Sequence, residues 1–207
     1  MKKFFEQLKH HWTQRELYPT EKLVILPKAN EDRPGNWHVA FIEHLAAIAR
    51  PANYVELGLY ECELFNRITP YANRLIGVDM NAHAGQHMKK SSKAEFWNMT
   101  TQEFGHKLKQ NPFTIDMIFI DADHSRDSVW NDFWNVLPYI SPHGLILLHD
   151  AHPGEASLID AGYCGDGYLT IDTLSRQRDE FEMMTLPFSP GLAICRKRKT
   201  QLSWQEE

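Results

Sequence analysis

Short apolar runs alternate along the chain with segments of helical periodicity. The clearest run, Met117 to Ile120, is too short for a helix and shows no clean alternation, which is typical of a strand covered on both faces. Similar runs occupy 54–57, 75–78, 94–99 and 145–148. Between them, apolar residues recur every three or four positions and predict helices with one buried stripe each. The pattern therefore predicts strands joined by crossover helices.

Two of the predicted helices lead directly into predicted strands. The first spans 36–50 and is ended by Pro51. We expect its core-facing stripe to consist of Trp37, Phe41, Leu45 and Ile48. The second spans 125–140, and the Ser-Pro-His-Gly sequence after it breaks the chain before the strand at 145–148.

The end of the chain has a different pattern. Two apolar segments, 181–186 and 192–195, flank a turn rich in proline and glycine, which predicts an antiparallel hairpin at a sheet edge. Five strand and helix units followed by this hairpin predict a doubly wound α/β fold, with a mostly parallel seven-stranded sheet and helices on both faces. We divide the chain into a cap segment at 1–35, one domain at 36–199 and a tail at 200–207.

Composition narrows the class of protein. The 207 residues, 43% hydrophobic and 24% charged, suit one ordinary globular core. A formal net charge of -5 gives no general attraction to nucleic acid, and no apolar run reaches the roughly 20 residues that span a membrane. The amino terminus lacks the apolar core of a signal peptide, so we expect a cytoplasmic protein. Three widely spaced cysteines suggest neither disulfides nor a structural zinc site.

Acidic residues and a glycine follow the first two predicted strands. Glu56 and Gly58 end the first strand before a helix, which is a nucleoside- or dinucleotide-binding layout because the glycine allows close backbone approach. Asp79 ends the second strand at an offset suited to binding ribose hydroxyls. Alone, Asp79 would be interpreted as a turn or capping residue, but its combination with Glu56 and Gly58 favours a ligand site.

Two later strands also end in charged residues. Asp121, Asp123 and His124 follow one strand, and His149 and Asp150 end the next. Ligands bind beyond the carboxyl ends of parallel strands, so both tips are predicted to face the same crevice. His124 is the candidate general base because imidazole titrates near physiological pH. Alternatively, Asp123 and His124 cap the following helix, and His149 is a packed structural histidine.

The same tips offer ligands for a divalent cation. Asp121 and Asp150, with His149 or His152, can bind a cation that lowers the pKa of an acceptor hydroxyl. Oxygen ligands favour Mg²⁺, and histidine shifts the preference towards Mn²⁺, Fe²⁺ or Zn²⁺. The remaining histidines, including His38, are predicted to be surface or packing residues.

Four motifs in order carry a family resemblance. They are Val55-Glu56-Leu57-Gly58, Gly77-Val78-Asp79, Ile120-Asp121-Ala122-Asp123-His124 and the segment from Gly144 to Asp150. Together they resemble class I S-adenosylmethionine-dependent methyltransferases. The Asp-Ala-Asp-His tip and the His-Asp strand ending are most similar to a small bacterial and phage group related to catechol-type and macrolide-sugar O-methyltransferases. The resemblance covers about 54–197 and implies methyl transfer to a small-molecule or sugar hydroxyl.

The resemblance also implies roles for individual residues. Gly58 and its neighbours would hold the methionine end of S-adenosylmethionine, Asp79 its ribose, and the segment 98–100 its adenine. The implied cofactor-binding residues are Glu56, Gly58, Tyr60, Asp79, Met80, Asn98, Met99, Thr100 and Asp121. Two positions depart from the family: Cys62 replaces a second glycine, and Ala151 follows Asp150 where the metal-dependent enzymes have asparagine.

These observations give three hypotheses. The first is an O-methyltransferase with catalytic His124 and Asp121, and with Asp121, His149 and Asp150 binding metal. The second, motivated by Cys62 and Ala151, is a non-catalytic S-adenosylmethionine-binding or regulatory module. The third, a nicotinamide-dependent oxidoreductase, is disfavoured because the first turn lacks Gly-x-Gly-x-x-Gly. We expect a small-molecule acceptor, no nucleic-acid or membrane partner, and a homodimer if Trp130 and Trp134 are exposed.

Overall fold

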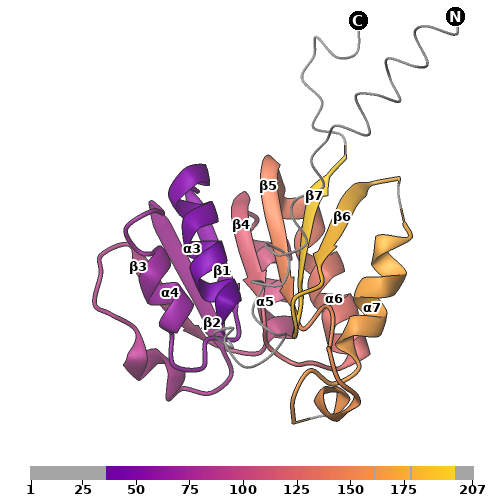
Figure 1. Cartoon of the computed structure of the whole chain (residues 1–207). Coiled ribbons are helices and arrows are strands. Elements are labelled where there is room, and N and C mark those ends of the chain that lie inside the picture. The colour runs from indigo at the N-terminus through magenta and orange to yellow at the C-terminus, as the bar shows by residue number, and fades with distance from the viewer. Residues whose placement is uncertain (1–35, 161, 178, 199–207) are drawn as a thin grey trace, which may run out of the picture. The chain divides into compact units, whose positions relative to one another are not determined.

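A single mixed sheet forms the centre of the protein. The structure is a computed structural model, which describes residues 36–160, 162–177 and 179–198. The strands are β1 (Asn53–Leu57), β2 (Arg74–Asp79), β3 (Ala94–Asn98), β4 (Ile115–Ile120), β5 (Ile140–His149), β6 (Phe181–Leu186) and β7 (Leu192–Lys197). Their order in the sheet is β3-β2-β1-β4-β5-β7-β6, and only the pairs that involve β7 are antiparallel (Figure 1). The predicted doubly wound fold with a hairpin at its edge is confirmed.

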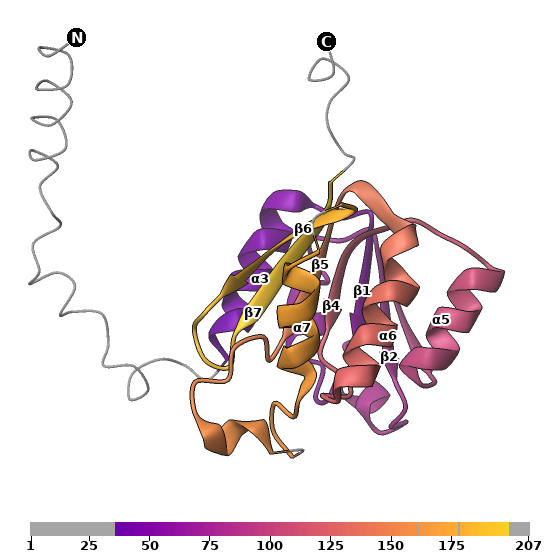
Figure 2. The same cartoon turned by 90° about the vertical axis from the view of Figure 1, so that its right-hand side faces the viewer.

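Helices lie on both faces of this sheet. They are α3 (Trp37–Ala49), α4 (Glu63–Ile68), α5 (Thr101–Gln110), α6 (Arg126–Val136) and α7 (Gly167–Ser175), with short 3-10 turns η1 (Ala84–His87), η2 (Leu137–Tyr139) and η3 (Ala156–Ile159). Figure 2 shows α5, α6 and α7 on one side of the sheet and α3 on the other. On the side of α3, Tyr54 of β1 packs against Phe65 of α4, with ring centroids 6.3 Å apart.

The central strands are buried on both faces, as their unbroken apolar runs predict. In β1, Val55 and Leu57 join the core under α5, α6 and α7, while Tyr54 points to the α4 side. The register pairs Leu57 with both Val78 of β2 and Ile120 of β4. The carboxyl ends of β1, β2 and β4 therefore lie side by side, and the polar residues that follow these three strands must meet there.

The helix predicted over 125–140 is shorter than expected. The α-helix ends at Val136 because Pro138 has no N–H to continue the hydrogen-bond ladder and its ring obstructs the preceding turn. Ile140 instead begins β5, where it pairs with Ile115 of β4. The Ser-Pro-His-Gly segment, expected to break the chain before the strand, lies within β5. It forms an irregular bulge between Ile140 and Leu145, which pairs with Met117.

The predicted buried stripe of the first helix is also wrong. In α3, Phe41 and Ile48 are 37% and 82% exposed. The buried side chains are His38, Val39, Ile42 and Ala46. Two adjacent stripes of this largely apolar helix have the same 3.6-residue period, so periodicity could not distinguish them. The helix is rotated so that His38 faces the sheet.

Two regions named in the sequence analysis, the predicted cap at 1–35 and the tail at 200–207, lie outside the described residues. The domain division stays a prediction. Among the described helices, none has the length and apolar character needed to cross a membrane. Trp130 is 37% exposed and packs against Trp134, with ring centroids 5.7 Å apart, while Trp134 also contacts Phe181 of β6. The tryptophan pair is thus partly core, and the homodimer stays a prediction.

Candidate active site

Gly58 allows two strand ends to touch. Its φ is +84°, and a Cβ atom placed there would lie 2.0 Å from the carbonyl oxygen of Asp121. Its N–H donates to the carbonyl of Val78 at 2.9 Å. Only glycine combines this left-handed backbone with such a close approach. The residue therefore brings the tips of β1, β2 and β4 together.

The turn after Gly58 keeps a backbone that normally requires glycine. Tyr60 and Cys62 have φ values of 47° and 56°, in the left-handed region. Cys62 is fully buried, and its thiol donates to the carbonyl of Ala84 at 3.2 Å. The replacement of the family's second glycine by Cys62 therefore leaves a glycine-like backbone and adds a buried side chain that ties the turn to η1.

Glu56, implied by the resemblance to bind cofactor, lies beneath this turn. It is 2% exposed and accepts a 2.6 Å hydrogen bond from the Tyr54 hydroxyl and a further one from the backbone N–H of Phe65 in α4. Burial raises the pKa of Glu56 to about 8; the Tyr54 bond opposes this shift, and the negative charge of Asp121 adds to it. In the structure this carboxyl group holds the start of α4 against β1.

Asp79 connects the tips of β1 and β2. One of its carboxylate oxygens accepts the Leu59 N–H at 2.9 Å, and the other accepts the Asn81 N–H at 2.8 Å. Two large side chains beside it, Tyr60 and Met80, are 84% and 76% exposed. A carboxylate at a strand end with large exposed side chains on neighbouring residues suits a nucleoside, with its ribose hydroxyls at the acid.

The segment Asn98 to Thr100 is fixed by bonds within the protein. The side-chain amide of Asn98 donates to the carbonyls of Asp79 and Met80 at 2.9 and 3.0 Å. Thr100 caps α5 in a reciprocal pair with Glu103, and Met99 packs partly buried against the core. The structure places all three beside the β2 tip, with Asn98 and Thr100 serving as structural anchors.

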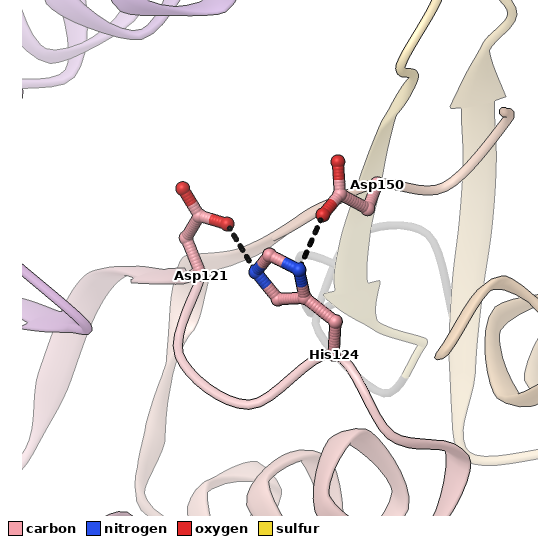
Figure 3. A group of neighbouring side chains, drawn as sticks. All are labelled: Asp121, His124 and Asp150. Carbon is pink, nitrogen blue, oxygen red and sulfur yellow. Dashed lines mark ion pairs between the residues drawn. The ribbon is translucent and has the colours of Figure 1, made fainter. Parts of the chain in front are cut away.

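A second group gathers at the ends of β4 and β5 (Figure 3). His124 lies between two carboxylates, with Nε2 3.4 Å from Asp121 Oδ1 and Nδ1 3.2 Å from Asp150 Oδ2. Suitable ligand atoms of these three residues all lie within 4.8 Å of one another. The structure thus brings together the predicted catalytic pair, His124 and Asp121, and two of the three predicted metal ligands, Asp121 and Asp150. Ala151, which is buried, offers no side-chain ligand.

The charges in this group support one another. The hydrogen bond to Asp121 raises the pKa of His124 to about 9; burial opposes the shift, while the Tyr163 carbonyl and Asp150 add to it. Burial tends to raise the pKa of Asp121, yet His149 and His124 outweigh it and hold that pKa well below its ordinary value. Near neutral pH, His124 is therefore an imidazolium between carboxylates.

His149 takes part in the same group from its buried side. Its Nδ1 lies 3.0 Å from Asp121 Oδ1 and 3.2 Å from Asp150 Oδ1, and its Nε2 lies 3.2 Å from His38 Nδ1. The sequence interpretation missed His38, which lies 111 positions from its partner. Nothing in its spacing could signal this contact; only the rotation of α3 reveals it.

The loop after β5 fixes His124 from above. The imidazole Nδ1 hydrogen-bonds to the carbonyl of Tyr163, and the carbonyl of His124 accepts the Gly167 N–H at 2.8 Å. Asp123 accepts the Ser125 N–H at 2.8 Å in the turn before α6, whose N-cap is Ser125, so it closes this turn and does not cap the helix as the alternative interpretation expected. His152 is exposed and lies outside the convergent ligand group. A small pocket here is lined by Ile120, Asp121, Ala122, Asp123, His124, Val129, Leu148, His149, Asp150, Cys164 and Gly167.

Part of the chain matches a known protein family. Residues 52–151, which contain all four sequence motifs, match the family model described as methyltransferase domain. This segment is a methyltransferase domain. The resemblance to class I S-adenosylmethionine-dependent methyltransferases is confirmed. No curated protein sequence matches the chain.

Solved structures show the same fold at low sequence identity. An O-methyltransferase from Bacillus cereus in complex with SAH is 15% identical, with a TM-score of 0.65 over 86% of this chain and 87% of that one. A putative caffeoyl-CoA O-methyltransferase from Staphylococcus aureus is 17% identical, with a TM-score of 0.64 over 95% and 98%. The N-methyltransferase NodS from Bradyrhizobium japonicum is 15% identical, with a TM-score of 0.59 over 80% and 97%. The methyltransferase fold is thus shared by proteins named for different acceptor atoms.

Proposed function

We propose that the protein transfers the methyl group of S-adenosylmethionine to a hydroxyl group of a small molecule or sugar. One observation carries the proposal: the backbone contact between Gly58 and Asp121 joins a nucleoside-type tip to a charged tip. Cofactor and acceptor would then meet at one edge of the sheet. SAH-bound relatives of the same fold support the choice of cofactor.

The residues at the β1 and β2 tips suit S-adenosylmethionine. When bound, this cofactor supplies an electrophilic methyl group, so the protein must chiefly align the acceptor and help remove its proton. The Asp79 carboxylate would bind the ribose hydroxyls, and Tyr60 and Met80 would flank the nucleoside. Gly58 leaves room for close backbone approach. Glu56 supports the turn from below through its hydrogen bonds.

His124 is the candidate base for the acceptor hydroxyl. Because its pKa is raised to about 9, it holds a proton near neutral pH and must lose that proton before it can act as a base. A divalent cation offers a second means of activating the hydroxyl. Asp121 and Asp150 would hold it, with His124 as the nitrogen ligand, and this mixed set favours Mn²⁺ or Fe²⁺ beside Mg²⁺; both nitrogens of His149, the third predicted ligand, already have partners.

The proposed partner is a small molecule, and the proposed location is the cytoplasm. The pocket at the charged group is small and is closed on one side by the loop around Tyr163, which suits a compact acceptor. Cys62, Cys164 and Cys195 are free thiols, as expected for a reducing compartment. A homodimer through Trp130 would be a further partner of the same protein.

Titration of S-adenosylmethionine and SAH into the purified protein tests the cofactor site. We expect binding by the wild type and a loss of at least about tenfold in affinity in Asp79→Ala, since a charged hydrogen bond contributes about 1.5–3 kcal/mol. Asp116→Ala is the matched control. Asp116 also accepts a backbone hydrogen bond, from the N–H of Asn53, but it lies at the opposite end of the strands. The Asp116→Ala variant should therefore bind S-adenosylmethionine with wild-type affinity. Absence of binding by the wild type would refute the methyltransferase proposal.

Turnover distinguishes the enzyme from a non-catalytic binding module. A screen of phenolic, sugar and amine acceptors, followed by SAH release, should reveal hydroxyl methylation that His124→Ala abolishes. Cofactor binding without SAH release from any acceptor, with or without Mg²⁺ or Mn²⁺, would favour the alternative module. If only amines were methylated, the acceptor atom in the proposed reaction would be nitrogen and not a hydroxyl oxygen.

A further inference from the structure

His38 and His149 form a buried pair behind the charged group. The two ring centroids are 4.1 Å apart, and His38 Nδ1 lies 3.2 Å from His149 Nε2. His38 is 8% exposed and stacks on Phe119 of β4, with centroids 5.9 Å apart and an interplanar angle of 23°. The ring of His38 is therefore held by packing, and it limits how the ring of His149 can rotate.

The other nitrogen of His149 faces only acceptors among its described partners. Its Nδ1 lies 3.0 Å from Asp121 Oδ1 and 3.2 Å from Asp150 Oδ1. Ionised carboxylate oxygens accept hydrogen bonds and cannot donate them, so this nitrogen must carry the proton. In neutral His149 with its proton on Nδ1, Nε2 accepts a hydrogen bond from His38 Nδ1–H; in the imidazolium form, Nε2 donates to His38 instead, and Nδ1 carries a proton in both cases. His149 then donates towards both carboxylates.

We propose that His38 is a positioning residue that fixes the ring orientation of His149, which in turn orients Asp121 and Asp150 towards His124. The inference rests on the proposed function in one respect, that these carboxylates are the site of the divalent cation. Partners behind the ligands commonly determine ligand orientation, and their loss typically lowers metal affinity 10–100-fold. Asp121 and Asp150 end neighbouring strands, so one imidazole can hold both.

Three variants separate hydrogen bonding from packing. His38→Phe keeps an aromatic ring against Phe119 and removes the hydrogen bond to His149. His38→Gln keeps a group that can donate or accept. His44→Phe makes the same chemical change on the same helix at an exposed histidine, whose Nδ1 pairs with the carbonyl of Ala40 at 2.7 Å. Circular dichroism on all three confirms that the fold is retained.

The first readout requires no ligand. Proton–nitrogen correlation spectra of the imidazole rings report how firmly the Nδ1 proton of His149 is held at fixed pH. We expect a slowly exchanging Nδ1–H in the wild type, His38→Gln and His44→Phe, and a shifted signal with faster proton exchange in His38→Phe, because the contact at Nε2 no longer holds the ring. An unchanged His149 spectrum in His38→Phe would overturn the inference.

The second readout is the affinity for Mn²⁺, measured by electron paramagnetic resonance. His38→Phe should bind about tenfold more weakly than the wild type, and His38→Gln and His44→Phe should bind within about threefold of it. Equal losses in His38→Phe and His38→Gln would argue against a role through the hydrogen bond. If the wild type binds no Mn²⁺, the metal in the proposed function fails, while the His149 spectra still decide the role of His38.

Discussion

At the scale of single residues, polar groups below the surface of the site support those that face it. Glu56 holds the turn and α4, Cys62 ties the turn to η1, and His38 supports His149. Each is at most 8% exposed, so its protonation or hydrogen bonding affects stability more strongly than that of an exposed side chain. Substitutions at these positions should therefore be visible in unfolding measurements before any activity is assayed.

Glu56 should make stability depend on pH. Its pKa in the folded protein, about 8, exceeds its ordinary value of 4.5, so its contribution is greatest below that ordinary value and is lost as pH rises towards 8. Between about pH 5 and pH 8 this loss amounts to roughly 3 kcal/mol. Glu56→Gln cannot ionise, and urea unfolding should show a correspondingly smaller fall in its free energy of unfolding. Glu63→Gln removes a half-exposed carboxylate at the start of α4 and should retain the wild-type pH dependence. If the free energy of unfolding of Glu56→Gln fell with pH as steeply as that of the wild type, the prediction would be refuted.

At the scale of elements, the site depends on how loops join the strand ends. The loop at 162–167 contacts His124 through two glycines: a Cβ atom on Gly165, whose φ is +56°, would lie 2.5 Å from the His124 carbonyl oxygen, and one on Gly167 would lie 2.9 Å from it. Arg126 N–H at the start of α6 donates to Asp166 of the same loop at 2.7 Å. The loop and the start of α6 thus form one unit that fixes the imidazole of His124.

Gly165→Ala should disturb this unit. The added methyl group would meet His124 backbone in a strained left-handed conformation, so we expect a loss of roughly 1–3 kcal/mol in the free energy of unfolding. We also expect slower methyl transfer with cofactor affinity unchanged, because the β1 and β2 tips are untouched. Gly162→Ala is the control in the same loop, since a Cβ atom there meets nothing within 4 Å. Equal stabilities of the two variants in urea unfolding would contradict this account.

The elements also show what the sequence could and could not predict. Strand runs such as 117–120 were found because burial on both faces leaves an unbroken apolar signal. The predicted buried stripe of α3 was wrong because two stripes share one period, and the predicted end of α6 was wrong because the apolar spacing continues past Pro138, which interrupts the helix. His124 and Asp79 were found from their places at strand ends. His38 was not, because its partner lies on a distant strand.

At the scale of the whole molecule, the parallel sheet concentrates charge at one edge. Asp121 and Asp150 lie together there, and the imidazoles of His124 and His149 lie within 3.4 Å of their carboxylate oxygens. The formal net charge of -5 attracts any cation weakly and without regard to place. Binding of a divalent cation at a specific site therefore differs from this general attraction in one testable way: it should be lost when one carboxylate of the site is removed.

A divalent cation that binds only the folded protein should raise the melting temperature. At 100 times its dissociation constant, Mn²⁺ would stabilise the wild type by about 2.7 kcal/mol, or roughly 5–10 °C for a chain of this size. Asp150→Asn should lose most of this rise. Asparagine tolerates the left-handed backbone of Asp150, whose φ is 54°, so the substitution removes the charge and little else. Asp172→Asn removes an equal charge from the exposed surface of α7 and should keep the full rise. An equal rise in both variants would assign the effect to net charge, and the absence of any rise in the wild type would leave His124 as the sole means of activating the acceptor.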